Sequence, residues 1–420
     1  MDTTGFGTVT MDVGRHMLDL GMDVRFLSQN DIGKVPPPFD TRTLSVPSFH
    51  TSEKHVDESG RLVVGGVSGL ESAIPDILMG QASRMMTADG GSWGDWKPDV
   101  AFILGDFAAV RFFVRPFIRA FASLPTFHYC PVEGVDLPPA WSLLWNVVRP
   151  VAMSEFGRGE IARVLGREVP MVYHGVDGDL FRPLSATNPL VIEDASGATH
   201  RLGTKAACRR FFGQDPSTQW VLRTDRHMPR KNYNSLIRAM GPVLVERPNV
   251  RLVIHCREWD QGGNLLDTLS KHPQEVRDRV VLTGLGPVPR EVLVALYNAA
   301  DVYVSSGAEG FGLTIAEAVA CGVPAVGIDY SAVPEVIGPA GAVVPVAALT
   351  DNEYDHFWAR PDERRLGEAV AWMLDHPAKA RALGAMGPGH VRENFQWRAA
   401  AEAFAALATE AVSSWGGVPA

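Results

Sequence analysis

Short apolar, β-branched runs alternate along the chain with segments of helical periodicity, and glycine or proline separates the two kinds. In the first half, strand patterns occur at 23–28, 99–104, 124–128 and 148–154. In the second half, they occur at 220–223, 250–256, 279–283, 301–305 and 324–328. Helical patterns occur at 9–20, 205–212, 232–246 and 289–298. Strands that alternate with helices form βαβ units, in which helices cover both faces of a parallel sheet. The pattern therefore predicts an α/β protein.

The 420 residues exceed what one hydrophobic core usually holds, so two domains are expected. A polar, turn-rich passage separates the two series of strands, and we place the junction there. Two doubly wound domains facing a cleft would bind ligands at the carboxyl ends of their strands. The amphipathic stretch 396–413 follows the last strand pattern, so we expect it to pack back on the first domain. The predicted units are 1–184, a connecting segment 185–218, 219–390, and a C-terminal helix within 391–420.

Charge and composition narrow the class of partner. A net charge of −9 gives the whole molecule no polycationic character, so nucleic acid or anionic membrane could be met only locally. The four cysteines form no CxxC pair, which argues against a disulfide framework or a zinc site. No apolar run approaches the roughly 18 residues of a membrane span, and Asp2 and Asp12 stand where a signal sequence would be basic. We expect a cytoplasmic protein without integral membrane contact.

One glycine-rich turn carries the clearest candidate chemistry. The segment EGFGLTIAE, from Glu309 to Glu317, follows a strand pattern and opens a helix that ends before Gly322. Glycines allow a ligand to approach the backbone closely, and N–H groups at a helix start bind phosphate oxygens. The two carboxylates are placed to accept hydrogen bonds from two different hydroxyl groups. Thr314 and Glu317 also have the T-x-x-E spacing of a capping box, and the motif alone leaves both interpretations open.

The wider context resembles the retaining GT-B glycosyltransferases of family four, also called glycosyl transferases group 1. EGFGLTIAE has that family's two glutamates separated by seven residues, and ACGVPAVG, SAVPE ending at Glu335, and GAVVPV follow in order. The passage SEFGRGEIARVLGREVPMVYHGVDGDLFRPL matches the end of the family's first domain, so DGD at 177–179 is interpreted as a turn and not a metal motif. The match covers about 151–346. It implies two Rossmann-like domains facing a central cleft, and no required metal ion or cofactor.

The resemblance also implies roles for individual residues. Arg226 and Lys231 match the basic pair that holds the donor diphosphate, although Asp225 stands where the family usually has glycine. Such cations can stabilise the charge on a departing diphosphate without a metal. Glu309 would bind the sugar and Glu317 the ribose. Backbone groups would complete the donor site at Gly5, Gly7, Gly284, Leu285, Gly310, Phe311, Gly312, Leu313 and Thr314.

Two further residues and one glycine-rich segment have weaker grounds for their assignment. His128 matches the family's reaction-centre histidine, which would bond a sugar hydroxyl or the reaction-centre backbone. Arg230, beside Lys231, is expected to be a solvated loop residue. TTGFGTVT at 3–10 matches the glycine-rich loop of the family's first domain, which faces the donor. A strand should precede that loop and only Met1 and Asp2 do, so the first strand is expected to be missing.

The acceptor is open at this point. Acidic Glu133 and Asp136 could contact it, although acidic loop residues are usually solvated. A basic stripe, interrupted by a proline, would arise if Arg111, Arg115 and Arg119 share a helix, and a solvated face is the expected interpretation. The TGFG start and the YCPVEG loop resemble phage-encoded family members, for which protein or hydroxymethylated DNA bases would be acceptors. Small molecules, lipids, proteins and modified DNA all remain candidates.

The sequence thus predicts transfer of a hexose from a UDP- or GDP-sugar to an acceptor hydroxyl with retention at the anomeric carbon. The departing phosphate oxygen would take the proton of the acceptor. Two other functions stay open: a GT-B sugar-nucleotide epimerase, and a nucleotide-sugar-binding module without transfer activity.

Overall fold

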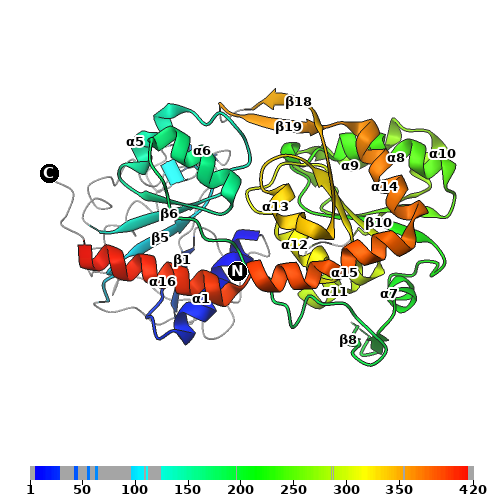
Figure 1. Cartoon of the computed structure of the whole chain (residues 1–420), viewed down its shortest axis with the longest axis horizontal. Helices are drawn as coiled ribbons and strands as arrows, with labels where there is room; N and C mark the ends of the chain where they lie inside the picture. The colour runs from blue at the N-terminus through cyan, green and yellow to red at the C-terminus, as the bar shows by residue number, and fades with distance from the viewer. Residues whose placement is uncertain are drawn as a thin grey trace.

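The computed structural model shows two α/β units joined by a connecting segment (Figure 1). It describes residues 5–28, 42–45, 54–56, 62–64, 96–107, 110–111, 124–194, 196–284, 286, 288–352 and 355–414. Leu285, Arg115 and Arg119 lie outside the described residues, so the predictions made for them have no structural outcome.

The second unit is built on a six-stranded parallel sheet with the order β14-β11-β10-β15-β16-β17. In that order its strands are β14 (Val280–Leu282), β11 (Val250–His255), β10 (Gln219–Thr224), β15 (Val302–Ser305), β16 (Ala325–Ile328) and β17 (Gly341–Val344). The central strands β10, β15 and β16 are almost wholly buried, as their continuous apolar runs predict. The chain order reverses between β10 and β15, so the crevice at the carboxyl ends of these two strands is the topological switch point.

Helices cover this sheet on both faces, in agreement with the predicted βα alternation (Figure 1). They are α8 (Tyr233–Glu246), α9 (Leu265–Ser270), α10 (Gln274–Arg277), α11 (Arg290–Ala299), α12 (Leu313–Ala320), α13 (Val333–Ile337), α14 (Glu363–Asp375) and α15 (Pro377–Asn394). Two small antiparallel hairpins were not predicted. They are β12 (Trp259–Asp260) with β13 (Gly263–Asn264), and β18 (Val346–Asp351) with β19 (Phe357–Pro361).

The first unit has a three-stranded parallel sheet of β5 (Ala101–Leu104), β6 (Thr126–Cys130) and β7 (Arg149–Ala152). Separate pairs are β1 (Phe26–Ser28) with β2 (Thr43–Ser45), and β3 (Lys54–Val56) with β4 (Leu62–Val64). Its helices include α1 (Gly5–Asp19), α5 (Ser142–Trp145) and α6 (Glu155–Leu165). Gly5 and Gly7 therefore lie in the first turn of α1, and this part of TTGFGTVT is helix where a loop was expected.

The connecting segment packs on the second unit. It consists of the antiparallel pair β8 (Leu190–Glu193) and β9 (Thr199–Leu202), followed by α7 (Lys205–Phe211). Lys205 and Arg209 of α7 both form ion pairs with Asp301, directly before β15. This segment is thereby attached to the central strands of the second sheet.

The last helix, α16 (Trp397–Ser414), returns to the first unit, which confirms the predicted crossing. Figure 1 shows it running beside α1, and the ring of Phe404 contacts the rings of Phe102 and Tyr129 edge-on. Gly175 lies at the crossing, where a Cβ would come within 2.1 Å of the Trp397 nitrogen.

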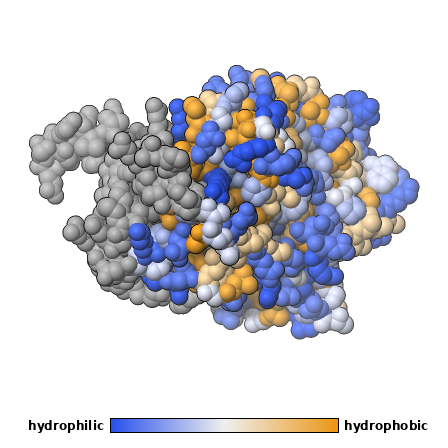
Figure 2. Space-filling view, turned by 60° about the vertical axis from the view of Figure 1, so that its left-hand side comes forward, coloured by the Kyte–Doolittle hydropathy of each residue, from blue (hydrophilic) through white to orange (hydrophobic). Residues whose placement is uncertain are grey.

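Among the described helices, none combines the length and apolar character needed to cross a membrane. Polar and apolar residues are interspersed over the described face in Figure 2.

Candidate functional site

The loops after β10 and β15 meet at the switch point and hold each other. The Ser306 hydroxyl donates to the Lys231 carbonyl at 2.8 Å, and the Asn232 amide donates to the Ser306 carbonyl at 3.1 Å. A Cβ on Gly307 would lie 2.4 Å from the Arg230 carbonyl oxygen, so this glycine is required where the two loops touch. The predicted site residues on these loops are therefore fixed relative to one another.

A buried charge network occupies the junction of these loops. Lys231 Nζ lies 2.5 Å from Glu309 Oε2 and 2.7 Å from Asp225 Oδ2. Arg223, fully buried beneath them, lies 3.0 Å from Asp225 and 3.6 Å from Glu309. The structure thus brings together Lys231 and Glu309, which are 78 positions apart in the sequence. Arg223 and Asp225 were not predicted as members of this network.

The two carboxylates of the network have pKa values shifted in opposite directions. Burial acts to raise the pKa of Asp225, but Lys231 and Arg223 outweigh it and lower that pKa. Burial raises the pKa of Glu309 in spite of the neighbouring Lys231. Glu309 Oε1 has no hydrogen-bond partner among the described residues, although it is shielded from solvent. Glu309 therefore has a carboxylate oxygen that could accept a hydrogen bond from a ligand hydroxyl, as a sugar-binding residue requires.

Arg230 and Glu133 correct two expectations. Both were expected to be solvated, yet their side chains are only 20% and 13% exposed and form an ion pair of 3.0 Å. Arg230 also donates to the Ala308 carbonyl at 2.8 Å and lies 3.6 Å from Glu309. Because Glu133 follows β6, Arg230 connects the donor loop to the first unit. Asp136, in contrast, is exposed as expected.

Arg226 lies at the rim of this site. Its side chain is 46% exposed, and its guanidinium forms a bidentate pair with Asp260 of β12 at 2.8 and 3.0 Å. A fixed fork of this kind suits phosphate oxygens as well as carboxylates. Its predicted role with a diphosphate stays a prediction.

Glu317 lies within α12 and is buried. Its Oε2 accepts a hydrogen bond from the Tyr297 hydroxyl at 2.7 Å. The helix begins after Gly312, and the Thr314 hydroxyl accepts instead from Tyr303 at 2.9 Å, so Glu317 is not part of a capping box. Burial raises the pKa of Glu317 to about 7, and the Tyr297 hydrogen bond, followed by the charge of Arg290, opposes this rise. A buried carboxylate without a charge partner in contact is typical of a ligand site rather than of a helix cap.

Two glycines of EGFGLTIAE have structural reasons that the sequence did not show. A Cβ on Gly310 would lie 2.7 Å from the Pro131 side chain of the first unit, and Gly312 has φ +104°. Close packing and backbone conformation require glycine here, and the expected close approach of a ligand to this backbone stays a prediction. The Phe311 ring packs against His174 and Phe395, so only its backbone could face a donor. Leu313 and Thr314 begin α12, and the first N–H groups of a helix have no partner within it.

Gly284 lies two residues after the end of β14 and has φ +62°, which favours glycine. It lies near the carboxyl edge of the same sheet, and the sequence resemblance assigned its backbone to the donor site. The roles predicted for Gly284, Gly5 and Gly7 stay predictions.

His128 lies on β6 with its ring fully buried. The Trp145 indole N–H donates to Nδ1 at 3.2 Å, so Nε2 carries the proton and donates to the Gly105 carbonyl at 2.9 Å. Burial lowers the pKa of His128 to about 4, so the ring is neutral near pH 7. Both ring nitrogens thus have protein partners, and the predicted role of His128 at the reaction centre stays a prediction.

Glu335 joins the two units at another point. Its carboxylate accepts hydrogen bonds from the first N–H groups of α6, at Glu155 and Phe156, both at 2.8 Å. It also accepts from the Tyr173 hydroxyl at 2.9 Å. A carboxylate is favoured at a helix N-terminus because the helix dipole attracts negative charge. The sequence identified this residue only as part of a motif.

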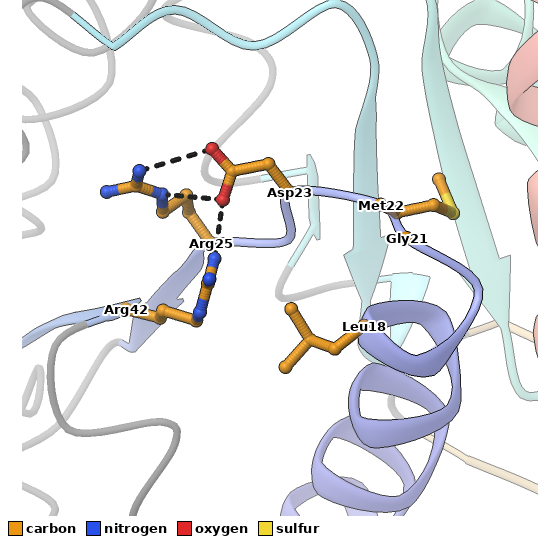
Figure 3. Close-up of a pocket in the computed structure, with 6 residues that line it drawn as sticks. All are labelled: Leu18, Gly21, Met22, Asp23, Arg25 and Arg42. Carbon is orange, nitrogen blue, oxygen red and sulfur yellow. Dashed lines mark hydrogen bonds and ion pairs between the residues drawn. The ribbon is translucent and has the colours of Figure 1, made fainter.

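A separate recess lies at the C-terminal end of α1 (Figure 3). Its carboxylate, Asp23, is paired with the guanidinium groups of Arg25 and Arg42. Arg25 foremost holds the pKa of Asp23 below its usual range. The recess adjoins the start of β1. It therefore lies at the edge of the sheet opposite to the carboxyl ends of the strands, which makes it a poor candidate for the reaction site.

In the described part of the chain, no group of three or more His, Cys, Asp or Glu side chains could hold a metal ion.

Comparisons with known proteins agree with this geometry. The family profile of Glycosyl transferases group 1 matches residues 218–354, which include the network and Glu317. A GDP-mannose-dependent monoacylated alpha-(1-6)-phosphatidylinositol monomannoside mannosyltransferase of Corynebacterium glutamicum is 28% identical over 201 residues, 46% of this chain and 48% of the relative. A D-inositol 3-phosphate glycosyltransferase of Segniliparus rotundus is 30% identical over 259 residues, 60% of this chain and 50% of the relative. The chain thus spans about half the length of these curated relatives.

A solved structure shows the same fold. Sucrose-phosphate synthase from Thermosynechococcus elongatus superposes with a TM-score of 0.64 at 19% identity, covering 96% of this chain and 92% of the other. This likeness extends over both units. The two Rossmann-like units therefore form the GT-B fold, and residues 218–354 of the second unit are similar to the glycosyl transferases group 1.

Proposed function

We propose that this protein transfers a hexosyl group from a UDP- or GDP-sugar to an acceptor hydroxyl, with retention at the anomeric carbon and without a metal ion. The observation that carries the proposal is the buried network of Lys231, Glu309, Asp225 and Arg223 at the switch point of the second sheet. Such a network has a high desolvation cost for stability alone, and it lies where ligands bind in this class of fold.

The donor fits the site as follows. Arg226 and Lys231 bind the diphosphate, the N-terminus of α12 adds backbone donors, and Glu317 accepts hydrogen bonds from the ribose hydroxyls. An ammonium group has three donors, and the contacts of Lys231 with Asp225 and Glu309 use two of them. Glu309 Oε1 accepts a hydrogen bond from a hydroxyl of the transferred sugar.

The reaction follows from this placement. The acceptor oxygen forms a bond to the anomeric carbon while the bond from that carbon to the diphosphate oxygen breaks, and the acceptor proton passes to that phosphate oxygen. Because both events then occur on one face of the sugar, the configuration is retained. Preorganised cations take up the developing charge, and removing one such group typically costs about 3 kcal/mol in the transition state.

The test is a panel of nucleotide sugars, with release of nucleotide diphosphate measured with and without candidate acceptors. UDP-glucose and GDP-mannose are the first donors, since a relative is named as GDP-mannose-dependent. The anomeric configuration of the product is determined by NMR, and activity is measured with and without EDTA. Inversion of configuration contradicts the retaining mechanism, and loss of activity in EDTA contradicts metal independence.

The same panel separates the other functions. An isomerised donor without acceptor indicates an epimerase, and nucleotide binding without turnover indicates a binding module. Lys231→Met is the test variant, and Lys271→Met, outside the site on an exposed turn, is its matched control.

A further inference from the structure

We propose that the Asp225 carboxylate limits how tightly the nucleotide diphosphate product is held, and so favours exchange of the product for a new donor. This inference rests on the proposed transfer reaction and concerns the step that follows it. In the donor both phosphates are esterified, whereas the product has a free terminal phosphate. That phosphate loses the proton it took from the acceptor, so at pH 8 the product carries about one negative charge more than the donor.

Asp225 lies between the two residues proposed to hold the diphosphate. It directly follows the central strand β10, at the switch point of the sheet. Its Oδ2 lies 2.7 Å from Lys231 Nζ, and its Oδ1 accepts the Arg226 backbone N–H at 2.8 Å. A phosphate bound by Lys231 and Arg226 would therefore lie close to a carboxylate, which already occupies one backbone donor of this loop.

The position of Asp225 is fixed from several sides. Its backbone N–H donates to the His255 carbonyl of β11 at 3.2 Å, and its own carbonyl accepts from the Tyr233 hydroxyl at 3.0 Å. Its Oδ2 also accepts from Arg223 at 3.0 Å, and Arg223 is fully buried. Backbone and carboxylate are thus both held on the sheet, so this negative charge stays in place when a ligand arrives.

Glu309, the other carboxylate in contact with Lys231, is held less firmly. Its Oε2 accepts from Lys231 at 2.5 Å, while Oε1 has no hydrogen-bond partner among the described residues. The Asp225 carboxylate, in contrast, contacts donors through both of its oxygens. A diphosphate that takes Lys231 as its partner therefore displaces Glu309 and leaves Asp225 where it is.

Asp225 also keeps its charge. Burial acts to raise its pKa, but Lys231 and Arg223 outweigh burial and hold that pKa below its usual range. In the free protein the charges of Arg223 and Lys231 match those of Asp225 and Glu309. Because Asp225 remains beside Lys231, every negative charge of a ligand bound there is repelled by it. The repulsion is greater for the more highly charged product than for the donor.

A purely structural role for Asp225 predicts a different behaviour. If this carboxylate only neutralised the buried Arg223, a neutral variant would be less stable and would bind nucleotides no better than wild type. If it also opposes the diphosphate, the same variant would be less stable and would bind nucleotides more tightly, because the site gains a net positive charge. Stability and affinity then change in opposite directions, which separates the two roles.

The test compares UDP with its β-methyl ester, or GDP with the corresponding ester, at pH 8 and low ionic strength. The ester has the charge of the donor and no sugar, so the comparison isolates the terminal phosphate charge from contacts of the sugar. Asp225→Asn keeps an oxygen for the Arg226 N–H and removes the charge. Its Kd for the diphosphate is expected to fall about tenfold or more, and the ratio of ester Kd to diphosphate Kd to rise about threefold or more.

Two further measurements follow the same variant. In the transfer assay, the inhibition constant of added diphosphate should fall by the same factor as its Kd. In melting curves, free Asp225→Asn should melt below wild type, because Arg223 loses its closest carboxylate, and saturating diphosphate should raise its Tm more than that of wild type. Asp267→Asn is the matched control, since Asp267 is an exposed residue of α9 and the net charge changes equally; its Kd values should stay within about twofold.

Two other variants keep the outcome clear should Asp225→Asn not fold. Arg223→Met combined with Asp225→Asn removes the buried cation together with its partner, and the Kd ratio should still rise by about twofold or more, because Asp225 is the closer of the two to the diphosphate site. Asp225→Glu keeps the charge, so its ratio should stay within about twofold of wild type.

An unchanged or lower Kd ratio in the folded variants, or weaker diphosphate binding in Asp225→Asn, overturns the inference while transfer by wild type leaves the proposed function standing. If wild type binds neither a nucleotide diphosphate nor a nucleotide sugar, the proposed function fails and this inference fails with it.

Discussion

The buried carboxylate of Glu317 should make the unliganded protein less stable than a variant without that charge. Its pKa rises from the ordinary 4.5 to about 7, mainly through burial, and its hydrogen-bond donor is the neutral Tyr297 hydroxyl. Because the pKa is raised in the folded state, this group's contribution to stability is fully present below pH 4.5 and is lost as the pH rises through 7. At pH 8 the penalty corresponds to about 3 kcal/mol.

The perturbation is Glu317→Gln, which is neutral at every pH and can still accept from Tyr297. At pH 8 the variant should therefore be more stable than wild type by up to about 3 kcal/mol, and at pH 4.5 the two should be alike. An unfolding entropy of about 2.1 cal/mol/K per residue gives about 0.9 kcal/mol/K for 420 residues, so the melting temperature should rise by about 3 °C. The same variant should bind nucleotide roughly 10- to 100-fold more weakly, because it replaces hydrogen bonds to a charged acceptor.

The assay is a pair of melting curves at pH 4.5 and pH 8, with nucleotide titrations at pH 8. Glu402→Gln is the control, since Glu402 is an exposed residue of α16 paired with Arg398, and a shift below about 0.5 kcal/mol is expected at either pH. A stability difference for Glu317→Gln that does not change with pH refutes the reasoning. So does a variant that melts lower than wild type at pH 8.

Three other changes probe the cleft. Lys231→Met should abolish transfer and lower the unfolding free energy by about 3–5 kcal/mol, because Glu309 is left as a buried charge without its closest partner. An activity assay measures the first effect, and denaturant unfolding measures the second. Gly310→Ala should impair transfer more than nucleotide binding, because the new Cβ would lie 2.7 Å from Pro131 and push the two units apart. Equal losses of transfer and of nucleotide binding would contradict this prediction. Glu335→Gln should weaken the contact between the units without changing nucleotide affinity, because one carboxylate oxygen that accepts from a backbone N–H becomes an amide NH2 group. Small-angle scattering of the free enzyme would detect the units moving apart. An unchanged scattering profile would count against a role of Glu335 in joining the units.

The fold was largely accessible from the sequence because its strands are buried on both faces. Continuous apolar runs predicted β10, β11, β15 and β16 within a few residues. The return of α16 to the first unit was predicted because its amphipathic pattern follows the last strand pattern, so it has to pack on a part of the protein that is already formed. The β18–β19 hairpin was not predicted, since its residues alternate between half-buried and exposed and carry no strong apolar run. Helix α1 begins earlier than expected because glycine at 5 and 7 was interpreted as loop chemistry.

The site was accessible only where a motif keeps its members close in sequence. Glu309 and Glu317 could be paired by their spacing, whereas the partnership of Arg230 with Glu133 joins positions nearly one hundred residues apart in different units. Charged loop residues have the same local sequence pattern whether they are solvated or paired. Nor does any local signal show that Trp145 sets the tautomer of His128, because that contact depends on how α5 packs over β6.

Under the proposed function, the charge balance at this site would couple donor binding to sugar recognition. Four cations and four carboxylates meet there, namely Arg223, Arg226, Arg230 and Lys231 with Glu133, Asp225, Asp260 and Glu309. A diphosphate adds negative charge to this balanced set, so it has to replace carboxylates as the partner of the cations it meets. Glu309 is the carboxylate whose charged form burial already disfavours. In the proposed function, exchange at Lys231 would therefore release Glu309 toward a hydroxyl of the incoming sugar, and phosphate binding and sugar binding would be steps of one rearrangement.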